Sequence, residues 1–381
     1  MKTILSMALL GSGLLQAQQG PAMPSEKACQ EFAQRFQAVV AGDDPSAMDS
    51  SIDFKAILVK GIRGVDVPAE FRKEIESGRP PEIPWGATIK KQIEEKGSYR
   101  FLRVREQGGA RKALFRIISP AGVNYQDYHL AAAEGGRVKV TDIYIYQNAE
   151  CLSETFSRMM VTAKLMQGDP SEPLTKPQSE YLAALRKAGE ARQLLQKGDA
   201  AGFLRSYATF PPALQREKCI LVFRTMAASQ VGEKEALDAM EDFKKAYPGD
   251  PCLDLISIDP LTMLKKYDKV LEAIERLDKS VGGDPYLDYI RASVHLLDEK
   301  LPKVKECAKR CIEREPTLEE PYWAMVHVAL KEKAWAETAR WLTTFEKTFK
   351  LEIGDLSENK VYAEFIKTPE YKAWLKGREK K

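Results

Sequence analysis

One histidine and two carboxylates form the most specific candidate for chemistry in this chain. Asp127 and His129 fall in one predicted strand, and Asp142 and Tyr144 fall in the next. If the two glycines between these strands form a two-residue turn, His129 pairs with Asp142 and Asp127 pairs with Tyr144. All four side chains then share one face of the sheet. A carboxylate opposite a histidine can orient the imidazole and raise its basicity, as general-base catalysis requires.

The same four residues also fit ordinary polar pairing on a sheet face. Perturbed groups occur in purely structural networks, so the sequence favours structural pairing over catalysis. Val138 and Val140 are predicted on this face too, so that it can line a cavity or cover a helix. A register slip of one residue would send His129 to the opposite face from Asp142.

Other signatures of enzymes are missing from the sequence. It contains no phosphate-binding loop, nucleophile elbow, zinc-binding helix motif or dinucleotide fingerprint. Its three histidines fall on three separate elements, which leaves few ligands for a metal centre. We therefore predict a protein that is not an enzyme and that holds no metal and no cofactor.

Four strands and the helices before them must position the polar cluster. Alternating apolar residues and short glycine-containing breaks predict an antiparallel meander. The four predicted strands are Tyr99–Glu106, Arg111–Ile118, Val123–Ala133 and Arg137–Tyr146. Amphipathic helical segments, the first running from about Glu26 to Val40, precede the strands. Helices that cover one face of such a sheet make an α+β domain.

The opening segment Phe36-Gln37-Ala38-Val39-Val40-Ala41-Gly42-Asp43 resembles the first helix and turn of the nuclear transport factor 2-like, or cystatin-like, fold. Together with the order of the elements, it extends this resemblance over residues 26–160. The resemblance implies a cone-shaped domain with a cavity. It implies nothing about the use of that cavity, because the fold carries many activities.

A period of 34 residues governs the C-terminal half. Tyr267, Leu301 and Trp335 follow one another at equal steps, with Glu233 one step earlier. The four units resemble tetratricopeptide repeats, and this implies two antiparallel helices per unit and an all-α right-handed superhelix. The first-helix tryptophan and glycine of that family are missing. Pro260 is predicted to break or shorten the first helix of the second unit.

The tetratricopeptide resemblance implies a concave groove lined by the first helix of each unit. Its predicted residues are Leu221, Leu255, Tyr286, Tyr289, Trp323 and His327. Such an apolar line suits a helix or an extended segment of a protein or peptide partner. A carboxylate clamp is disfavoured, because no lysine or asparagine stands at the fifth or ninth position of a unit. The alternative is that Tyr289 and Trp323 pack between units.

The first residues predict export. Lys2, the apolar run that follows and a small-residue site at Ala17 read as a cleavable signal peptide over residues 1–17. No cysteine follows closely enough for lipid attachment, so we predict a periplasmic or secreted protein without a membrane span. The mature chain has 57 basic and 55 acidic residues, a balance that argues against nucleic acid as a partner.

The predicted organisation has five parts. These are a signal peptide (1–17), the α+β domain (26–160), a linker (161–178), the helical repeats (179–352), and a C-terminal helical cap with a basic tail (353–381). The preferred function is an exported scaffold that binds a protein or peptide in its groove. The alternative is a ligand-binding or enzymatic α+β domain, with the repeats serving for anchoring or dimerisation.

Six cysteines permit disulfides in an exported chain without requiring them. Cys29 with Cys151 and Cys219 with Cys252 are the candidate pairs. Cys307 and Cys311 stand four residues apart on one predicted helix, where buried packing is favoured over a metal site.

Overall fold

The computed structural model of the chain describes residues 23–42, 44–63, 65, 67, 69–78, 82–94, 97–167 and 175–378. The predicted signal peptide at 1–17 lies outside these residues. Within the described part, no helix is both long enough and apolar enough to cross a bilayer.

Helices precede the sheet in the described part of the chain, as predicted. Ser25 caps the first of them, because its side chain accepts a hydrogen bond from the backbone N–H of Ala28 at 3.2 Å. Phe32 and Phe36 lie on the buried stripe of this helix. The helices of this part are α1 (Glu26–Ala41), α2 (Ser46–Asp49), α3 (Phe54–Gly61), α4 (Ala69–Ser77) and α5 (Trp85–Ile93).

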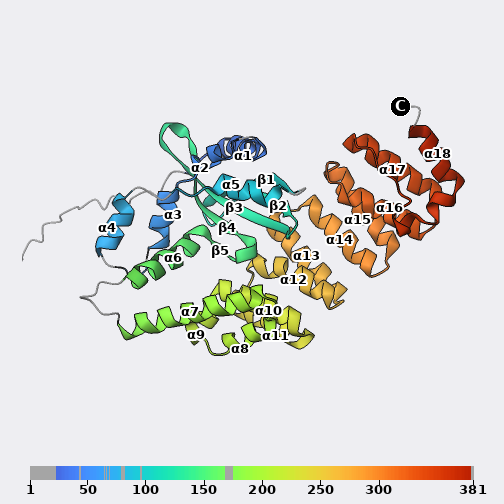
Figure 1. Ribbon diagram of the computed structural model, residues 1–381. Coiled ribbons are helices and arrows are strands. Elements are labelled where there is room, and N and C mark those ends of the chain that lie inside the picture. Colours follow the sequence, from blue (N-terminus) through green and yellow to red (C-terminus); the bar gives the residue numbers. More distant parts are fainter. Residues whose placement is uncertain are drawn as a thin grey trace, which may run out of the picture.

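The sheet is an antiparallel meander with strand order β1-β2-β3-β4-β5. Its strands are β1 (Ser98–Gln107), β2 (Ala110–Ser119), β3 (Gly122–Ala132), β4 (Val138–Ile145) and β5 (Glu150–Cys151). The four predicted strands are therefore confirmed, and a two-residue fifth strand adds to them. The five strands form one continuous layer (Figure 1).

One face of the sheet packs on the helices through an aromatic core. Phe36 of α1 lies 5.7 Å from Phe115 of β2 and 5.1 Å from Tyr128 of β3, measured between ring centroids. Trp85 of α5 donates its indole N–H to the Tyr128 hydroxyl at 3.1 Å. This face, called the inner face below, is thus filled with large side chains.

The turn between β3 and β4 differs from the prediction. Residues 134–136 form one 3₁₀ turn, closed by a hydrogen bond of 2.7 Å from the Ala133 N–H to the Arg137 carbonyl. The expected two-residue turn is therefore wrong. A β-bulge at Thr141 compensates for the difference, so His129 still pairs with Asp142. The bulge reverses the side chains before it, and Val138 and Val140 consequently pack on the inner face.

The helical half contains the repeats at the predicted spacing. Their first helices are α10 (Lys218–Val231), α12 (Pro251–Met263), α14 (Pro285–Leu297) and α16 (Glu320–Lys331). Their second helices are α11 (Glu233–Ala246), α13 (Tyr267–Val281), α15 (Leu301–Arg314) and α17 (Trp335–Phe349). The second helices start 34 residues apart, at the residues that the period predicted. Successive helical hairpins stack side by side (Figure 1).

Helices lead into this stack and also close it. The entry consists of α6 (Leu152–Gln167), α7 (Lys176–Gln196), α8 (Ala200–Tyr207) and α9 (Pro212–Gln215). Helix α6 reaches Gln167 and α7 begins at Lys176, so helices occupy both ends of the range 161–178 for which a linker was predicted. The end of the stack is capped by η3 (Lys360–Tyr362), η4 (Phe365–Lys367) and α18 (Pro369–Arg378). Phe365 and Trp374 of this cap bury against the last unit.

Helix α12 corrects the expectation for Pro260. The helix continues through Pro260 and ends at Met263. Because Pro260 stands in the last turn, its missing N–H removes one hydrogen bond close to the helix end and leaves the earlier turns intact.

Candidate functional site

Parts of the two predicted sites face each other across one interface. The sheet face away from the helices, called the outer face below, packs against the first helices of the first three repeat units. Leu114 and Tyr125 of the sheet, with Tyr146 directly after β4, share one apolar cluster with Leu255 and Ile258 of α12. The sheet lies against the stack at α12 and α13 (Figure 1). The repeats therefore hold the chain's own α+β domain.

A buried arginine is the centre of this interface. Arg116 of β2 is 1% exposed and reaches two carboxylates of the repeats. Its Nη1 lies 2.5 Å from Asp284 Oδ1, and its Nη2 lies 2.6 Å from Glu315 Oε1. Burial acts to lower the pKa of the Arg116 guanidinium, but Asp284 and Glu315 outweigh that effect and raise the pKa above its ordinary value. The ion pair is thus charged and closed to water.

Two aspartates one repeat apart connect helix capping with the interface. Asp250 and Asp284 are the N-caps of α12 and α14, where each side chain accepts a backbone N–H. Each also accepts a tyrosine hydroxyl from the outer face, Asp250 from Tyr144 at 2.6 Å and Asp284 from Tyr125 at 2.7 Å. Burial and the neighbouring aspartate raise the pKa of both tyrosines, so both hydroxyls stay protonated and donate.

The loop between α13 and α14 gives a third set of contacts. Arg103 of β1 donates to the carbonyls of Gly282 and Gly283, and Arg105 donates to the carbonyl of Ser280. Gly282 and Gly283 have φ values of 78° and 95°, a region in which a side chain would be strained. The two glycines thus let the loop turn its carbonyls toward the strand.

The predicted polar cluster is divided between two networks. Asp127 forms an ion pair with Arg105, and Tyr144 bonds to Asp250, so these two residues belong to the interface. Asp142 instead lies 2.7 Å from Lys60 Nζ and accepts the Ser153 hydroxyl at 2.7 Å. Burial acts to raise the pKa of Asp142, but these two partners outweigh it and lower the pKa.

His129 and Asp142 stand opposite each other in the strand register, as expected. Their side chains form no hydrogen bond with each other in the described structure. His129 Nε2 is buried and has no hydrogen-bond partner among the described residues. Burial, together with the positive charge of Lys112, lowers the pKa of His129 to about 4. The imidazole is therefore neutral at pH 7. Because Lys60 and Ser153 occupy the Asp142 carboxylate, the geometry favours the structural interpretation of these residues.

The buried imidazole predicts a pH dependence of stability. The pKa of His129 is about 4 in the folded chain against 6.5 ordinarily, so the unfolded chain takes up the proton first as the pH falls. The contribution of His129 is complete above pH 6.5 and is lost toward pH 4. We expect the free energy of unfolding to fall by about 2 kcal/mol between pH 7.5 and pH 5. Urea denaturation at the two pH values measures this difference.

The variant His129→Gln should lose most of the difference. The variant His327→Gln should keep most of it, because this histidine is exposed and its pKa, although lowered by burial and by Lys331, is shifted less than that of His129. An unchanged pH dependence in His129→Gln would contradict the assignment.

Most of the predicted groove residues lie at the interface. Leu221 clusters with Ala149 of the sheet domain, Leu255 packs with Leu114, and Tyr286 packs with Ile118. Tyr289 lies 5.3 Å from the Tyr286 ring, measured between centroids, and joins the same cluster. These four side chains pack with the chain's own sheet, which corrects the expectation that they face a free groove.

The remaining two groove residues lie in the fourth unit. Trp323 packs on Phe345 with 4.6 Å between ring centroids, and it is half-buried. His327, one helical turn later on α16, is exposed. Trp323 therefore combines packing between helices with a surface that a partner can reach.

Sequence reasoning missed the residues that carry the interface. Arg116, Tyr125, Asp250 and Asp284 were not among the predicted site residues. A signal was present in the repeated Gly-Asp-Pro sequence, which recurs after one period of 34 residues at 249–251 and 283–285. That motif predicts a helix N-cap, and the cap is also the side chain that the sheet contacts.

The cysteines are unpaired in this arrangement. All six are free thiols, so neither candidate disulfide is formed. Cys307 and Cys311 are buried between repeat helices, in agreement with the packing interpretation. Within the described residues, no group of three histidine, cysteine or acidic side chains is arranged to hold a metal ion.

The fold places the chain in a class: an α+β domain followed by tetratricopeptide-like helical repeats that hold it. No family model matches the sequence, and no curated protein matches it. Two solved structures that the chain is similar to are the "MamA RS-1 ArsTM double mutant" and "MamA 41-end from Desulfovibrio magneticus RS-1". Each is 15% identical with a TM-score of 0.37, and each match covers 44% of this chain. The matches cover 94% and 95% of those chains, respectively.

Proposed function

We propose that this chain is an exported, non-enzymatic scaffold that binds a protein or peptide through its fourth repeat unit. The observation that carries the proposal is that the chain's own sheet already occupies the groove of the first three repeat units. The outer face of the sheet packs with Leu221, Leu255, Tyr286 and Tyr289 of the first three units. Trp323 of α16 packs instead with the last unit and the cap, so the partner surface is at that end of the groove.

The α+β domain then has a structural task. Held at Asp250 and Asp284, it braces three units of the stack against bending. We also propose that this domain belongs to the nuclear transport factor 2-like class, on the basis of its element order and of helices that cover one sheet face. Export rests on the signal peptide predicted over residues 1–17.

The enzymatic alternative gains no support from the sheet. Asp127 is paired with Arg105 within the sheet, and Tyr144 donates to Asp250 across the interface. Asp142 is engaged with Lys60. Aromatic side chains fill the inner face. A general base must lie within reach of the proton that it takes from the substrate. His129 Nε2 is buried and closed off from solvent.

A pull-down from a native cell-envelope fraction tests the proposal. The double variant Trp323→Leu with His327→Ala keeps an apolar side chain against Phe345 and removes the indole and the imidazole. We expect the amount of bound partner to fall at least about tenfold, as for the loss of a binding hot spot. Circular dichroism verifies that the variant is folded.

The matched control changes two exposed apolar side chains in the first two units, Met263→Ala with Val231→Ala. The control should retain the partner. If the Trp323 and His327 variant retains all partners of the wild-type protein, the fourth unit is not the binding surface.

A further inference from the structure

An arginine-lined hollow lies where the sheet meets the repeats. It has a volume of about 360 Å³ between β1, the start of α14 and the end of α15. Its lining residues are Arg100, Phe101, Leu102, Arg103, Pro285, Arg314 and Glu315. Three positive side chains thus share a small space with one negative side chain.

The acidic residue of the hollow is already saturated with partners. Glu315 accepts from Arg116 with both of its oxygens, at 2.6 and 3.1 Å, and also pairs with Arg100 at 2.9 Å. Its negative charge therefore mainly compensates the positive charge of the buried Arg116. Glu315 leaves the other arginines of the hollow without full compensation.

Arg103 shows this imbalance most clearly. Among the residues that the structure describes, its guanidinium bonds only to the carbonyls of Gly282 and Gly283, and its Nε is buried without a partner. Burial lowers the pKa of Arg103. The charges of Asp284 and Asp278 act in the opposite direction, but Arg105 and Arg314 oppose them and the pKa stays below its ordinary value. Nearby anionic charge would therefore relieve crowding of positive groups at this point.

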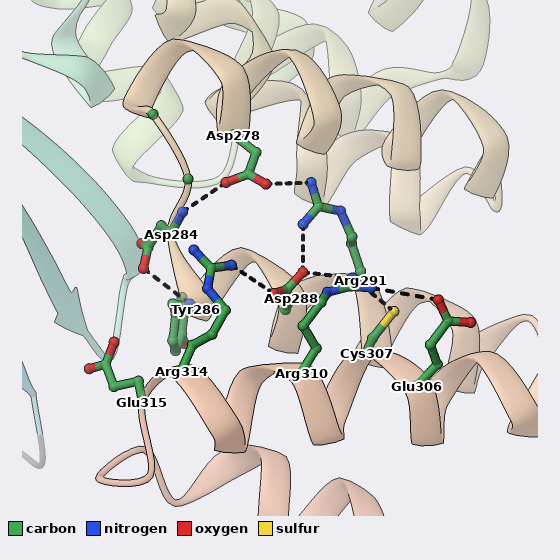
Figure 2. A network of polar contacts seen from close by, with 12 residues as sticks. Asp278, Asp284, Tyr286, Asp288, Arg291, Glu306, Cys307, Arg310, Arg314 and Glu315 are labelled. Atoms are coloured by element: carbon green, nitrogen blue, oxygen red, sulfur yellow. Dashed lines mark hydrogen bonds and ion pairs between the residues drawn. The ribbon is translucent and has the colours of Figure 1, made fainter.

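Arg100 and Arg314 keep donors within reach of solvent. Their side chains are 44% and 41% exposed, respectively. Figure 2 shows Arg314 extending from α15 to Asp288, which it contacts through one nitrogen at 3.0 Å. A guanidinium presents several N–H donors in a planar fork that matches the oxygens of carboxylate and phosphate groups.

We infer that this hollow is a binding site for an oxyanion, a phosphate or a carboxylate group held by Arg100, Arg103 and Arg314. Phe101, Leu102 and Pro285 complete the lining of the hollow. A ligand here would bridge β1 to α14 and α15, and so would bind the assembled interface more tightly than the unfolded chain.

Calorimetric titration of the full chain tests this site at constant ionic strength. One arm uses inorganic phosphate, and the second uses a terminally blocked tetraglutamate peptide. We expect saturable binding in at least one arm. Binding of phosphate alone identifies a phosphate-type ligand, and binding of the peptide alone identifies a carboxylate-bearing segment. If neither probe binds saturably, the inference is overturned.

Two variants connect binding to the hollow. The double variant Arg100→Gln with Arg314→Gln should weaken binding at least about tenfold, because it removes two charge-assisted contacts. The control Arg340→Gln changes an exposed arginine of α17 that is 68% exposed, and it should bind as the wild type does. Equal affinity in the double variant and the control would overturn the inference. If circular dichroism shows that the double variant is unfolded, Arg100→Gln alone replaces it, with a weaker affinity than the control as the expected result.

Discussion

Replacing Arg116 with alanine is expected to lower the free energy of unfolding by about 3–5 kcal/mol, a loss typical of breaking a buried ion pair on one side. The substitution leaves Asp284 and Glu315 with buried negative charge that has lost its main partner. Both carboxylates belong to the repeats, so the loss falls on the contact between the two halves of the chain. Urea denaturation followed by circular dichroism measures it.

The matched control is Arg137→Ala, at an exposed position beside the turn between β3 and β4. It removes the same charge from the same sheet and should change stability by less than about 0.5 kcal/mol. A loss below about 1 kcal/mol in Arg116→Ala would mean that Arg116 does not hold the halves together. A separate early transition in the variant, reported by the sheet alone, would show that the halves come apart before either unfolds.

The second large effect is expected at Asp284, where two roles of one side chain can be separated. Asparagine caps a helix about as well as aspartate but carries no charge. Asp284→Asn should therefore cost about 2–3 kcal/mol for the weakened contact with Arg116. Asp284→Ala should cost about 1 kcal/mol more, because it also removes the N-cap of α14. Chemical denaturation of both variants separates the contribution of the contact with Arg116 from that of the helix cap.

Asp250 provides the comparison one repeat earlier. Its cation is Lys218, which is 24% exposed, whereas Arg116 is 1% exposed. Asp250→Asn should therefore cost only about 1 kcal/mol, and Asp250→Ala should again add the cost of a lost cap. Equal losses in Asp284→Asn and Asp250→Asn would show that the burial of Arg116 does not set the size of the effect.

The sequence predicted the elements that depend on local pattern. Strand alternation identified β1 to β4, and the starts at Tyr267, Leu301 and Trp335 agree with the second helices of their units. Both signals repeat within a short stretch of chain, so one sequence suffices to detect them. Pro260 was misjudged because the effect of a proline depends on its distance from the helix end, which the pattern alone places poorly.

The pairing of His129 with Asp142 was predicted correctly from an incorrect turn. The turn and the bulge at Thr141 each shift the register by one residue, and the two shifts cancel beyond the bulge. Between the turn and the bulge they do not cancel, and Val138 and Val140 therefore face the helices. No residue type demands a bulge at Thr141, so packing on the inner face decides it.

The interface itself was beyond local inference. Arg116 meets Asp284 across 168 residues and Glu315 across 199 residues of sequence. The apolar groove residues were recognised, but an apolar line has the same sequence pattern whether it binds another protein or this chain's own sheet. Leu255 and Tyr286 belong to the second case. Only the spatial placement of the α+β domain distinguishes the two.

The sequence separation within the Arg116 network also has a consequence for biosynthesis. A ribosome makes about 5–20 residues per second, so the 199 residues between Arg116 and Glu315 take roughly 10–40 s to produce. During that interval the newly made sheet carries Arg116, Leu114 and Tyr125 on a surface that has no counterpart yet. The nascent domain needs shielding for this period, from a chaperone or from delayed folding, until the third repeat has been made.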